Sequence, residues 1–149
     1  MNIEPLRWWQ IDDLLPIEKD LFGAEAWTAR MFWNELANGH NYLVATEDDG
    51  TILGYAGLAV TQGEAWINNL AVRRDAQRRG IGAALLERLL ADARRQDAKQ
   101  VLLEVAAENE AAQLLYGKYG FEAIGIRRGY YQPSNTDALV MQMELKNEG

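Results

Sequence analysis

Glu104 and Tyr116 are the side chains of this sequence whose types and spacing most favour proton-transfer chemistry. Glu104 interrupts an apolar stretch at residues 100–105 that predicts a short strand. Tyr116 follows on a predicted helix, where it shares one face with Asn109 and Ala112 because these residues are three, four and seven positions apart. A carboxylate can accept a proton, a phenol can donate one, and an amide can hold a ligand. Each residue also has a structural interpretation: Glu104 as an edge-strand carboxylate, Asn109 as a helix cap, Tyr116 as a core aromatic.

A basic turn that contains two glycines is the second chemical feature. The run Gln77-Arg78-Arg79-Gly80-Ile81-Gly82, followed by Ala83, lies between a predicted strand at 65–72 and the longest predicted helix. The first turn of a helix has free N–H groups and the positive end of the helix dipole, and glycine lets the backbone approach a phosphate. Four arginines at this cation-disfavouring helix end suggest a bound anion in a chain of net charge −7: Arg73, Arg74, Arg78 and Arg79. The alternative is a solvated turn whose glycines serve helix packing.

Two other phosphate-binding motifs do not fit this turn. A dinucleotide-binding fold would need a third glycine where Leu85 stands, and an acidic residue about 20 positions further on. A Walker loop would need Gly-Lys-Ser/Thr after the turn, and that sequence is missing here.

Composition narrows the classes of function. The chain has no cysteine, which excludes disulfides, thiolate metal sites and a cysteine nucleophile. Its single histidine, His40, excludes a histidine-rich metal site and disfavours a Ser-His-Asp triad, so we expect no metal. The net charge of −7 argues against direct nucleic-acid binding. No apolar run approaches the ~18 residues of a membrane span and no signal peptide is recognisable, so we expect a cytoplasmic protein without membrane contact.

Periodicity predicts an α+β chain that fits one domain over residues 1–149. Strands are expected at 3–7, 42–46, 52–61, 65–72, 100–105, 121–127 and 138–145. Helices are expected at 10–22, from Thr28 to about 36, from about Gly80 onward, and at 110–119. Pro16 should kink or split the first helix. In the longest helix, Arg88, Asp92 and Arg95 are expected to face water.

The chain resembles the GNAT superfamily of acetyl-CoA-dependent N-acetyltransferases. Q-x-x-G-x-G after a strand is similar to the coenzyme-A motif of that superfamily. Within it, the chain resembles the branch of ribosomal-protein alanine N-acetyltransferases, closely over residues 66–145 and more loosely before, where Trp27-Thr28 is similar to a Trp-Ser pair. That branch is indicated by Leu103-Glu104-Val105, Asn109, Ala111-Ala112, Leu115-Tyr116, Gly120-Phe121, Arg127-Arg128-Gly129-Tyr130-Tyr131, Asp137-Ala138 and Met141.

The resemblance implies a fold, a cosubstrate and an acceptor. The implied GNAT fold is a mixed α/β architecture with a mostly antiparallel sheet of six to seven strands, a splayed parallel pair in its middle, and about four helices. Acetyl-CoA would be the cosubstrate, and the acceptor would be the N-terminal peptide, beginning with alanine, of a small-subunit ribosomal protein.

The resemblance also implies residue roles. Glu104 would be the general base and Tyr116 the general acid for direct attack of the amine on the thioester. Tyr130 and Tyr131 could wall the peptide groove; alternatively, one packs in the core and the other lies on the surface. Coenzyme-binding roles are implied for Leu70, Ala71 and Val72 at a strand bulge, for Gln77, Arg78, Arg79, Gly80, Ile81, Gly82 and Ala83 at the pyrophosphate, and for Asn109 and Ala112 along the pantetheine arm.

Three departures from the family pattern bear on specificity. Ala106 and Glu108 stand where arginine and serine are usual, and Trp66 stands where histidine is common. Other acceptors therefore stay open: a lysine side chain or a small-molecule amine. A non-catalytic acetyl-CoA-binding protein is a further alternative, against which the presence of both Glu104 and Tyr116 argues.

Overall fold

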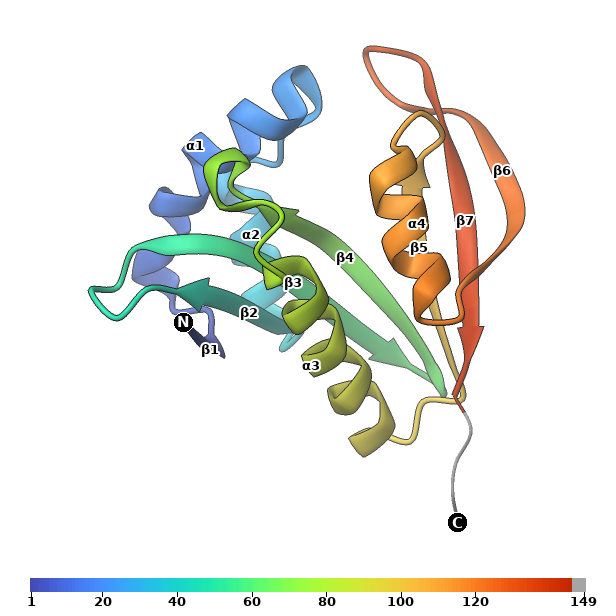
Figure 1. The fold of residues 1–149 in the computed structure, drawn as a ribbon, viewed down its shortest axis with the longest axis horizontal. Helices are drawn as coiled ribbons and strands as arrows, with labels where there is room; N and C mark the ends of the chain where they lie inside the picture. Colours follow the sequence, from blue (N-terminus) through green and yellow to red (C-terminus); the bar gives the residue numbers. More distant parts are fainter. Residues whose placement is uncertain (146–149) are drawn as a thin grey trace.

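The computed structural model describes residues 1–145, and a twisted seven-stranded sheet forms its centre (Figure 1). The strands are β1 (Asn2–Pro5), β2 (Asn41–Thr46), β3 (Ile52–Thr61), β4 (Glu64–Val72), β5 (Gln100–Ala106), β6 (Glu122–Tyr131) and β7 (Thr136–Glu144). The helices are α1 (Ile11–Phe22), α2 (Ala29–Ala37), α3 (Ile81–Arg95) and α4 (Glu110–Lys118). Short 3-10 turns lie at Trp8–Gln10, Gly23–Glu25 and Arg74–Ala76.

The strand order in the sheet is β1-β2-β3-β4-β5-β7-β6. Every neighbouring pair is antiparallel except β4 and β5, which run parallel because α3 connects them. The predicted α+β class, with a mostly antiparallel sheet, a central parallel pair and four helices, is confirmed.

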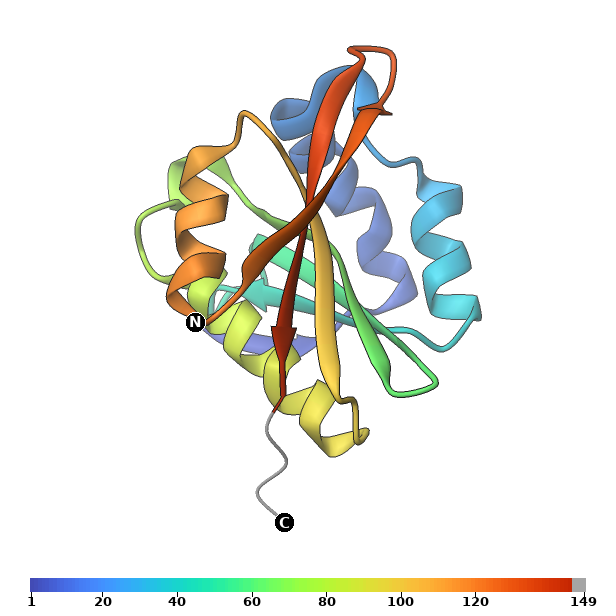
Figure 2. The same ribbon diagram turned by 90° about the vertical axis from the view of Figure 1, so that its right-hand side faces the viewer.

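Within residues 1–145, two helices cover each face of the sheet. Figure 2 shows α3 and α4 on one side of the strands and α1 and α2 on the other. Two apolar clusters match these layers: α3 and Tyr116 of α4 contribute to one, and α1 and Phe32 of α2 contribute to the other. On β5, Val101, Leu103 and Val105 belong to the α3–α4 cluster, so Glu104, which alternates with them, points to the opposite face.

Local signals in the sequence explain where three of the helices begin. The side chain of Thr28 accepts a hydrogen bond from the Met31 N–H at the start of α2. Asn109 does the same for the Ala112 N–H at the start of α4. Gly80 precedes α3 with φ of +79°, a left-handed conformation that favours glycine. The predicted caps at Thr28 and Asn109 are confirmed.

The predicted split at Pro16 and the predicted exposure of Asp92 were wrong, while a kink at Pro16 stays a prediction. Pro16 does not split α1, which runs without a break from Ile11 to Phe22. A proline has no N–H to donate to the carbonyl four residues earlier, and here both Pro16 and Asp12 are exposed residues. Asp92 does not face water: it is 4% exposed.

The burial of Asp92 has a clear cause in its partners. It forms ion pairs with Arg88 and Arg95 of its own helix, and its carboxylate accepts a hydrogen bond from the Asn41 side chain of β2. Asp92 thus joins α3 to β2, a long-range contact that helical periodicity alone does not reveal.

Candidate active site

The parallel pair β4–β5 separates part-way along its length and leaves an opening in the sheet. Its pairing runs from Glu64↔Gln100 to Ile67↔Leu103 and then stops, although β4 continues to Val72 and β5 to Ala106. The opening lies beside a pocket of about 390 Å³ whose walls come from both strands, the α1–α2 connection, α4 and the β6–β7 hairpin. The predicted splay is therefore present in the middle of the sheet.

A bulge in β4 accompanies this separation. Between Gly57↔Asn68 and Tyr55↔Ala71, β4 carries one more residue than β3. Asn69 lies within the bulge and has φ of +59°, a left-handed conformation that is uncommon for a residue other than glycine. The bulge re-aims the backbone of β4 at the place where β5 leaves it.

The pocket gathers seven of the predicted site residues. They come from β4, β5, the start and middle of α4, and the end of β6: Leu70, Glu104, Asn109, Ala112, Tyr116, Tyr130 and Tyr131. The remaining predicted residues do not line it: Ala71, Val72, Gln77, Arg78, Arg79, Gly80, Ile81, Gly82 and Ala83.

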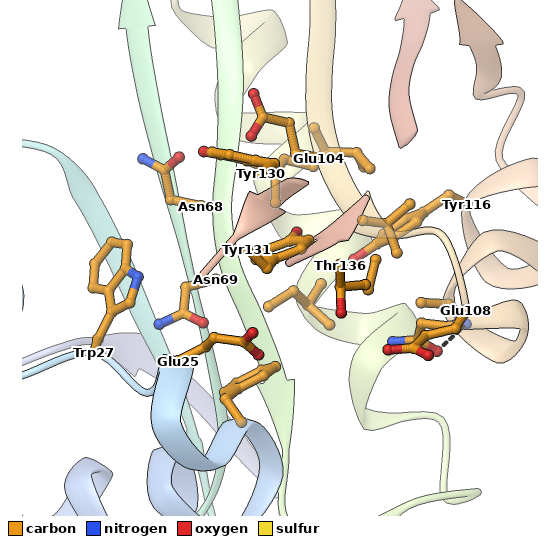
Figure 3. A pocket seen from close by; sticks show the side chains of 18 of the residues that line it. Glu25, Trp27, Asn68, Asn69, Glu104, Glu108, Tyr116, Tyr130, Tyr131 and Thr136 are labelled. Atoms are coloured by element: carbon orange, nitrogen blue, oxygen red, sulfur yellow. Dashed lines mark hydrogen bonds between the residues drawn. The ribbon is translucent and has the colours of Figure 1, made fainter. Parts of the chain in front are cut away.

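Glu104 projects into the pocket from β5 and contacts two side chains of β6. Its Oε1 atom lies 3.3 Å from Nε of Arg127, and its side chain is 13% exposed. The guanidinium of Arg127 stands 5.5 Å from the centre of the Tyr130 ring. Figure 3 shows Tyr130 beside the Glu104 carboxylate. A hydrogen bond with Glu104, together with burial, raises the pKa of Tyr130 to about 12. Glu104 is therefore a largely buried carboxylate that lies against an arginine and a tyrosine of β6.

Tyr116 reaches the same pocket from α4, on the other face of the sheet. The residue is 7% exposed and its ring packs edge-on against Phe121, with ring centres 5.7 Å apart. Burial raises the pKa of Tyr116 to about 12, so its hydroxyl stays protonated at neutral pH. Tyr116 therefore belongs to the apolar core and also lines the pocket.

Tyr131 also lines the pocket, from the end of β6. Its pKa is raised to about 12, mainly by burial and then by the neighbouring charges of Tyr130, Glu104, Tyr116 and Glu25. In Figure 3 its ring lies between the Asn69 side of the pocket and Tyr116. Tyr131 therefore lies near both candidate proton-transfer groups, Glu104 and Tyr116.

The basic turn lies behind the pocket wall and not inside it. A Cβ atom built on Gly82 would stand 3.7–3.8 Å from the side chains of Leu70, Val72 and Leu115. Two of these, Leu70 and Leu115, line the pocket. The start of α3 is thus in contact with the wall of the pocket, so a ligand could extend from the pocket to the turn.

The arginines of this turn differ in their ionic partners. Arg73 pairs with Asp75, Arg74 with Asp20, and Arg79 with Glu47. Within residues 1–145, Arg78 has no such partner, and its backbone is left-handed with φ of +65°. The Gln77 side chain donates a hydrogen bond to the Val72 carbonyl at 3.1 Å. Gln77 therefore braces the turn, while the Arg78 guanidinium is available to an anion.

The sequence and the fold have counterparts among known proteins. The family model described as Acetyltransferase (GNAT) family matches residues 4–121. The chain belongs to the GNAT acetyltransferase family. It is 38% identical over 133 residues to the N-alpha-acetyltransferase RimI of Mycobacterium tuberculosis, covering 86% of this chain and 82% of that protein. It is 34% identical over 122 residues to the [ribosomal protein bS18]-alanine N-acetyltransferase of Escherichia coli K12, covering 80% and 81%.

A solved GNAT structure matches almost the whole fold. The crystal structure of the ribosomal-protein-S18-alanine N-acetyltransferase from Escherichia coli superposes with a TM-score of 0.89 at 31% identity, covering 99% of this chain and 96% of that one. The chain is thus a GNAT N-acetyltransferase related to these alanine N-acetyltransferases, and GNAT enzymes use acetyl-CoA. Within residues 1–145, no cluster of three or more histidine, aspartate or glutamate side chains could hold a metal ion, and no helix there could cross a membrane.

Several lining residues of this GNAT pocket were not predicted from the sequence. They come mainly from the α1–α2 region and the bulge of β4, and they include Glu18, Glu25, Asn68, Asn69 and Thr136. One signal was available: Glu18 stands between Leu14 and Leu21 on the apolar stripe of α1, where a charged residue is unusual. The left-handed backbone of Asn69 had no comparable signal.

Proposed function

We propose that this GNAT enzyme is an N-alpha-acetyltransferase that acetylates the N-terminal alanine of the small-subunit ribosomal protein bS18. The observation that carries the proposal is that Glu104 and Tyr116 line one pocket at the splayed strands, from opposite faces of the sheet. The relative from Escherichia coli, a [ribosomal protein bS18]-alanine N-acetyltransferase, supports this acceptor, and the N-alpha-acetyltransferase of Mycobacterium tuberculosis supports transfer to an α-amine.

In the proposed reaction, a neutral α-amine attacks the thioester carbonyl of acetyl-CoA directly. The new C–N bond forms as the C–S bond breaks, and no covalent enzyme intermediate is needed. An α-amino group has a reference pKa of about 7.7–8.0, so a weak base suffices to take its proton. Glu104 takes that proton, directly or through one water.

The leaving thiolate receives a proton in the same reaction. Tyr116 donates it from its hydroxyl, which its raised pKa of about 12 keeps protonated. Backbone N–H groups of β4 beyond Ile67, where pairing with β5 has ended, are candidates to stabilise the developing oxyanion. Holding the amine and the thioester together supplies much of the remaining acceleration.

The coenzyme fits the opposite side of the opening. Asn109 and Ala112 line the pocket at the start of α4 and are proposed to contact the pantetheine arm. The turn from Gln77 to Ala83 is proposed to hold the pyrophosphate, with free N–H groups at the start of α3 and the Arg78 side chain. The open space around Gly80, where a Cβ atom would meet nothing within 4 Å, fits a close approach by a phosphate.

A hydrogen bond over the acceptor side of the pocket favours a chain end as substrate. The Ser134 hydroxyl, in the β6–β7 hairpin, donates to the Glu25 carboxylate in the α1–α2 connection. Glu25 lines the pocket, and so do Tyr130 and Tyr131 just before the hairpin tip. A substrate with an internal lysine would have to pass its backbone through the pocket entrance in both directions, and the Ser134–Glu25 bridge narrows that entrance. An N-terminal peptide needs to enter from one side only.

Mass spectrometry of acetylated peptides tests this proposal. We would incubate the protein with acetyl-CoA and a peptide that begins with alanine and contains one internal lysine. A matched peptide would have its N-terminus already acetylated, and a third sample would contain a small amine such as spermidine. We expect one acetyl group on the free N-terminal peptide and none on the matched peptide. Acetylation of the lysine, or of the small amine alone, would replace the proposal with that acceptor. Tight coenzyme-A binding without any transfer would favour the non-catalytic alternative.

A further inference from the structure

Glu18 is a fully buried carboxylate of the pocket that has no role in the proposed proton transfers. It projects from α1 with 0% exposure and lines the pocket. It accepts hydrogen bonds from the Trp27 backbone N–H at 2.9 Å, from the Tyr55 hydroxyl at 2.8 Å, and from the Asn69 side-chain amide. In all three hydrogen bonds the partner donates and a Glu18 oxygen accepts. This arrangement suits an ionised carboxylate, which has no proton to donate and can only accept hydrogen bonds.

No cation accompanies this buried charge among residues 1–145. The ion pairs within that range involve other acidic residues, not Glu18. The charge of Glu18 also contributes to raising the pKa of Tyr42 and of Tyr55, after burial as the main cause. A buried carboxylate without a cationic partner depends on its hydrogen bonds, so removal of the charge or of one donor should disturb the group as a whole.

The donors belong to three segments that are distant in sequence and meet at the site. Trp27 follows the Gly23–Glu25 turn, which carries the bridge to the β6–β7 hairpin. Asn69 forms the left-handed bulge of β4 beside the opening in the sheet. Tyr55 lies on β3 behind the bulge and does not line the pocket. Figure 3 shows Asn69, Trp27 and Glu25 together on one side of the pocket.

We propose that Glu18 is a positioning residue that ties the acceptor wall of the pocket to the bulge of β4 and so sets the distance between amine and thioester. Its bond to the Trp27 N–H fixes the α1–α2 connection, and its bond to the Asn69 amide holds a backbone conformation that asparagine adopts at some cost. A small misplacement of two reactants costs an enzyme much of its rate. This inference rests on the proposed amine acetylation.

Substitution Glu18→Gln tests the role with little change in shape. Glutamine keeps one carbonyl oxygen but turns an NH₂ group toward donors, so at least one of the three bonds is lost. We expect kcat to fall at least ~10-fold and the peptide KM to rise, because about 1 Å of misplacement is costly. We expect the Kd of coenzyme A, measured by calorimetry, to change less than ~3-fold, because the hydrogen-bond partners of Glu18 are Trp27, Tyr55 and Asn69 and none belongs to the turn before α3. The exposed acid Asp13 of the same helix gives the matched control, and Asp13→Asn should match wild type.

Tyr55→Phe is the second variant, because Glu18→Gln could fail to fold. It removes one donor outside the pocket and leaves the bonds to Trp27 and Asn69 in place. A smaller fall in kcat than in Glu18→Gln, again with unchanged coenzyme-A binding, supports the role. If Glu18→Gln folds and has the kcat and peptide KM of the wild-type enzyme, the positioning role of Glu18 is wrong. If Glu18→Gln does not fold, a wild-type kcat and peptide KM in Tyr55→Phe overturn the role instead. The activity of the wild-type enzyme toward the alanine peptide tests the proposed acceptor independently of the variants. If the wild-type enzyme does not acetylate that peptide, the proposed acceptor is wrong, and the variants are then compared with the amine that the wild-type enzyme does acetylate.

Discussion

The Nε atom of Arg127 lies 3.3 Å from the Oε1 atom of Glu104, although a whole strand separates their positions in the sheet. β7 runs between β5 and β6: the register neighbour of Arg127 on β7 is Ala138, and the register neighbour of Glu104 is Val140. The Arg127 side chain therefore reaches diagonally across β7 to the Glu104 carboxylate. The candidate base is therefore held from β6 by both Arg127 and Tyr130.

Replacement of Glu104 tests its role as the base. We expect Glu104→Gln to lower kcat by about 10²-fold, because loss of a general base typically costs about that much. The measurement is the steady-state rate with a peptide beginning with alanine, at saturating acetyl-CoA. Glu122→Gln, an exposed acid on β6, is the matched control and should retain the wild-type rate. A near-normal kcat in Glu104→Gln would remove Glu104 from this role.

Replacement of Arg127 tests whether the ion pair orients the base. The Arg127 side chain is 54% exposed, so the pair is worth at most about 1 kcal/mol. We therefore expect Arg127→Met to lower kcat/KM by no more than about fivefold, which corresponds to that free energy. Arg128→Met is the neighbouring control, because Arg128 is 82% exposed and lies 3.6 Å from Asp137. Equal effects in the two variants would mean that the contact with Glu104 has no special part in the rate.

Replacement of Tyr116 tests its role as the acid. We expect Tyr116→Phe to lower kcat by about 10²-fold, since phenylalanine keeps the packing on Phe121 but has no proton to donate. The raised pKa of about 12 adds a pH dependence to the wild-type enzyme. Because Tyr116 stays protonated below that pH, the rate should show no alkaline decline from this residue up to pH ~10. An alkaline decline of the rate between pH 8 and 10 that is present in the folded wild-type enzyme and missing from the residual activity of Tyr116→Phe would contradict the assignment.

Much of the fold could be predicted because the local signals are strong. The predicted strand at 52–61 has the bounds of β3, and the predicted caps Thr28 and Asn109 accept hydrogen bonds as expected. These features depend on neighbours in the sequence. The parallel splayed pair was expected only through the family resemblance, because a strand pattern does not reveal its partners.

The missed parts of the site depend on contacts between distant segments. One example is the hydrogen bond from Ser134 to Glu25, and another is the ion pair of Arg127 with Glu104. Each joins segments far apart in the sequence, and the sequence does not state which residues of such segments lie side by side. Asp92 was placed on the wrong face for the same reason, since its partner Asn41 lies on another element. The start of α3 was predicted as a phosphate site from glycine and charge, and that assignment stays a prediction.

Arg78 offers a direct test of the turn at the start of α3. Its guanidinium has no acidic partner within residues 1–145, whereas Arg74 pairs with Asp20 at 3.2 Å. If the turn holds the pyrophosphate, Arg78→Met should weaken coenzyme-A binding by about threefold to tenfold, as loss of one charged hydrogen bond does. Arg74→Met is the control and should bind like wild type. Calorimetric titration with coenzyme A gives both Kd values, and an unchanged Kd in Arg78→Met would place the anion elsewhere.

The tyrosines make folding stability sensitive to alkaline pH. All six have raised pKa values: burial is the main cause for Tyr42, Tyr55, Tyr116 and Tyr131, and a hydrogen bond to a glutamate is the main cause for Tyr119 and Tyr130.

A raised pKa means that the folded state holds its phenolic protons more tightly than the unfolded chain, whose tyrosines titrate near pH 10. The stabilisation from this source is complete below pH ~10 and is lost as pH rises through the folded values, about 12 for Tyr116, Tyr130 and Tyr131. We therefore expect the free energy of unfolding in urea to fall between pH 10 and pH 12. Absorbance at 295 nm should report less tyrosinate at pH ~10.5 in the folded protein than in the urea-unfolded chain. Identical titration midpoints near pH 10 in both states would show that the tyrosines are less buried than described, and would remove the pH argument for Tyr116 as a permanently protonated acid.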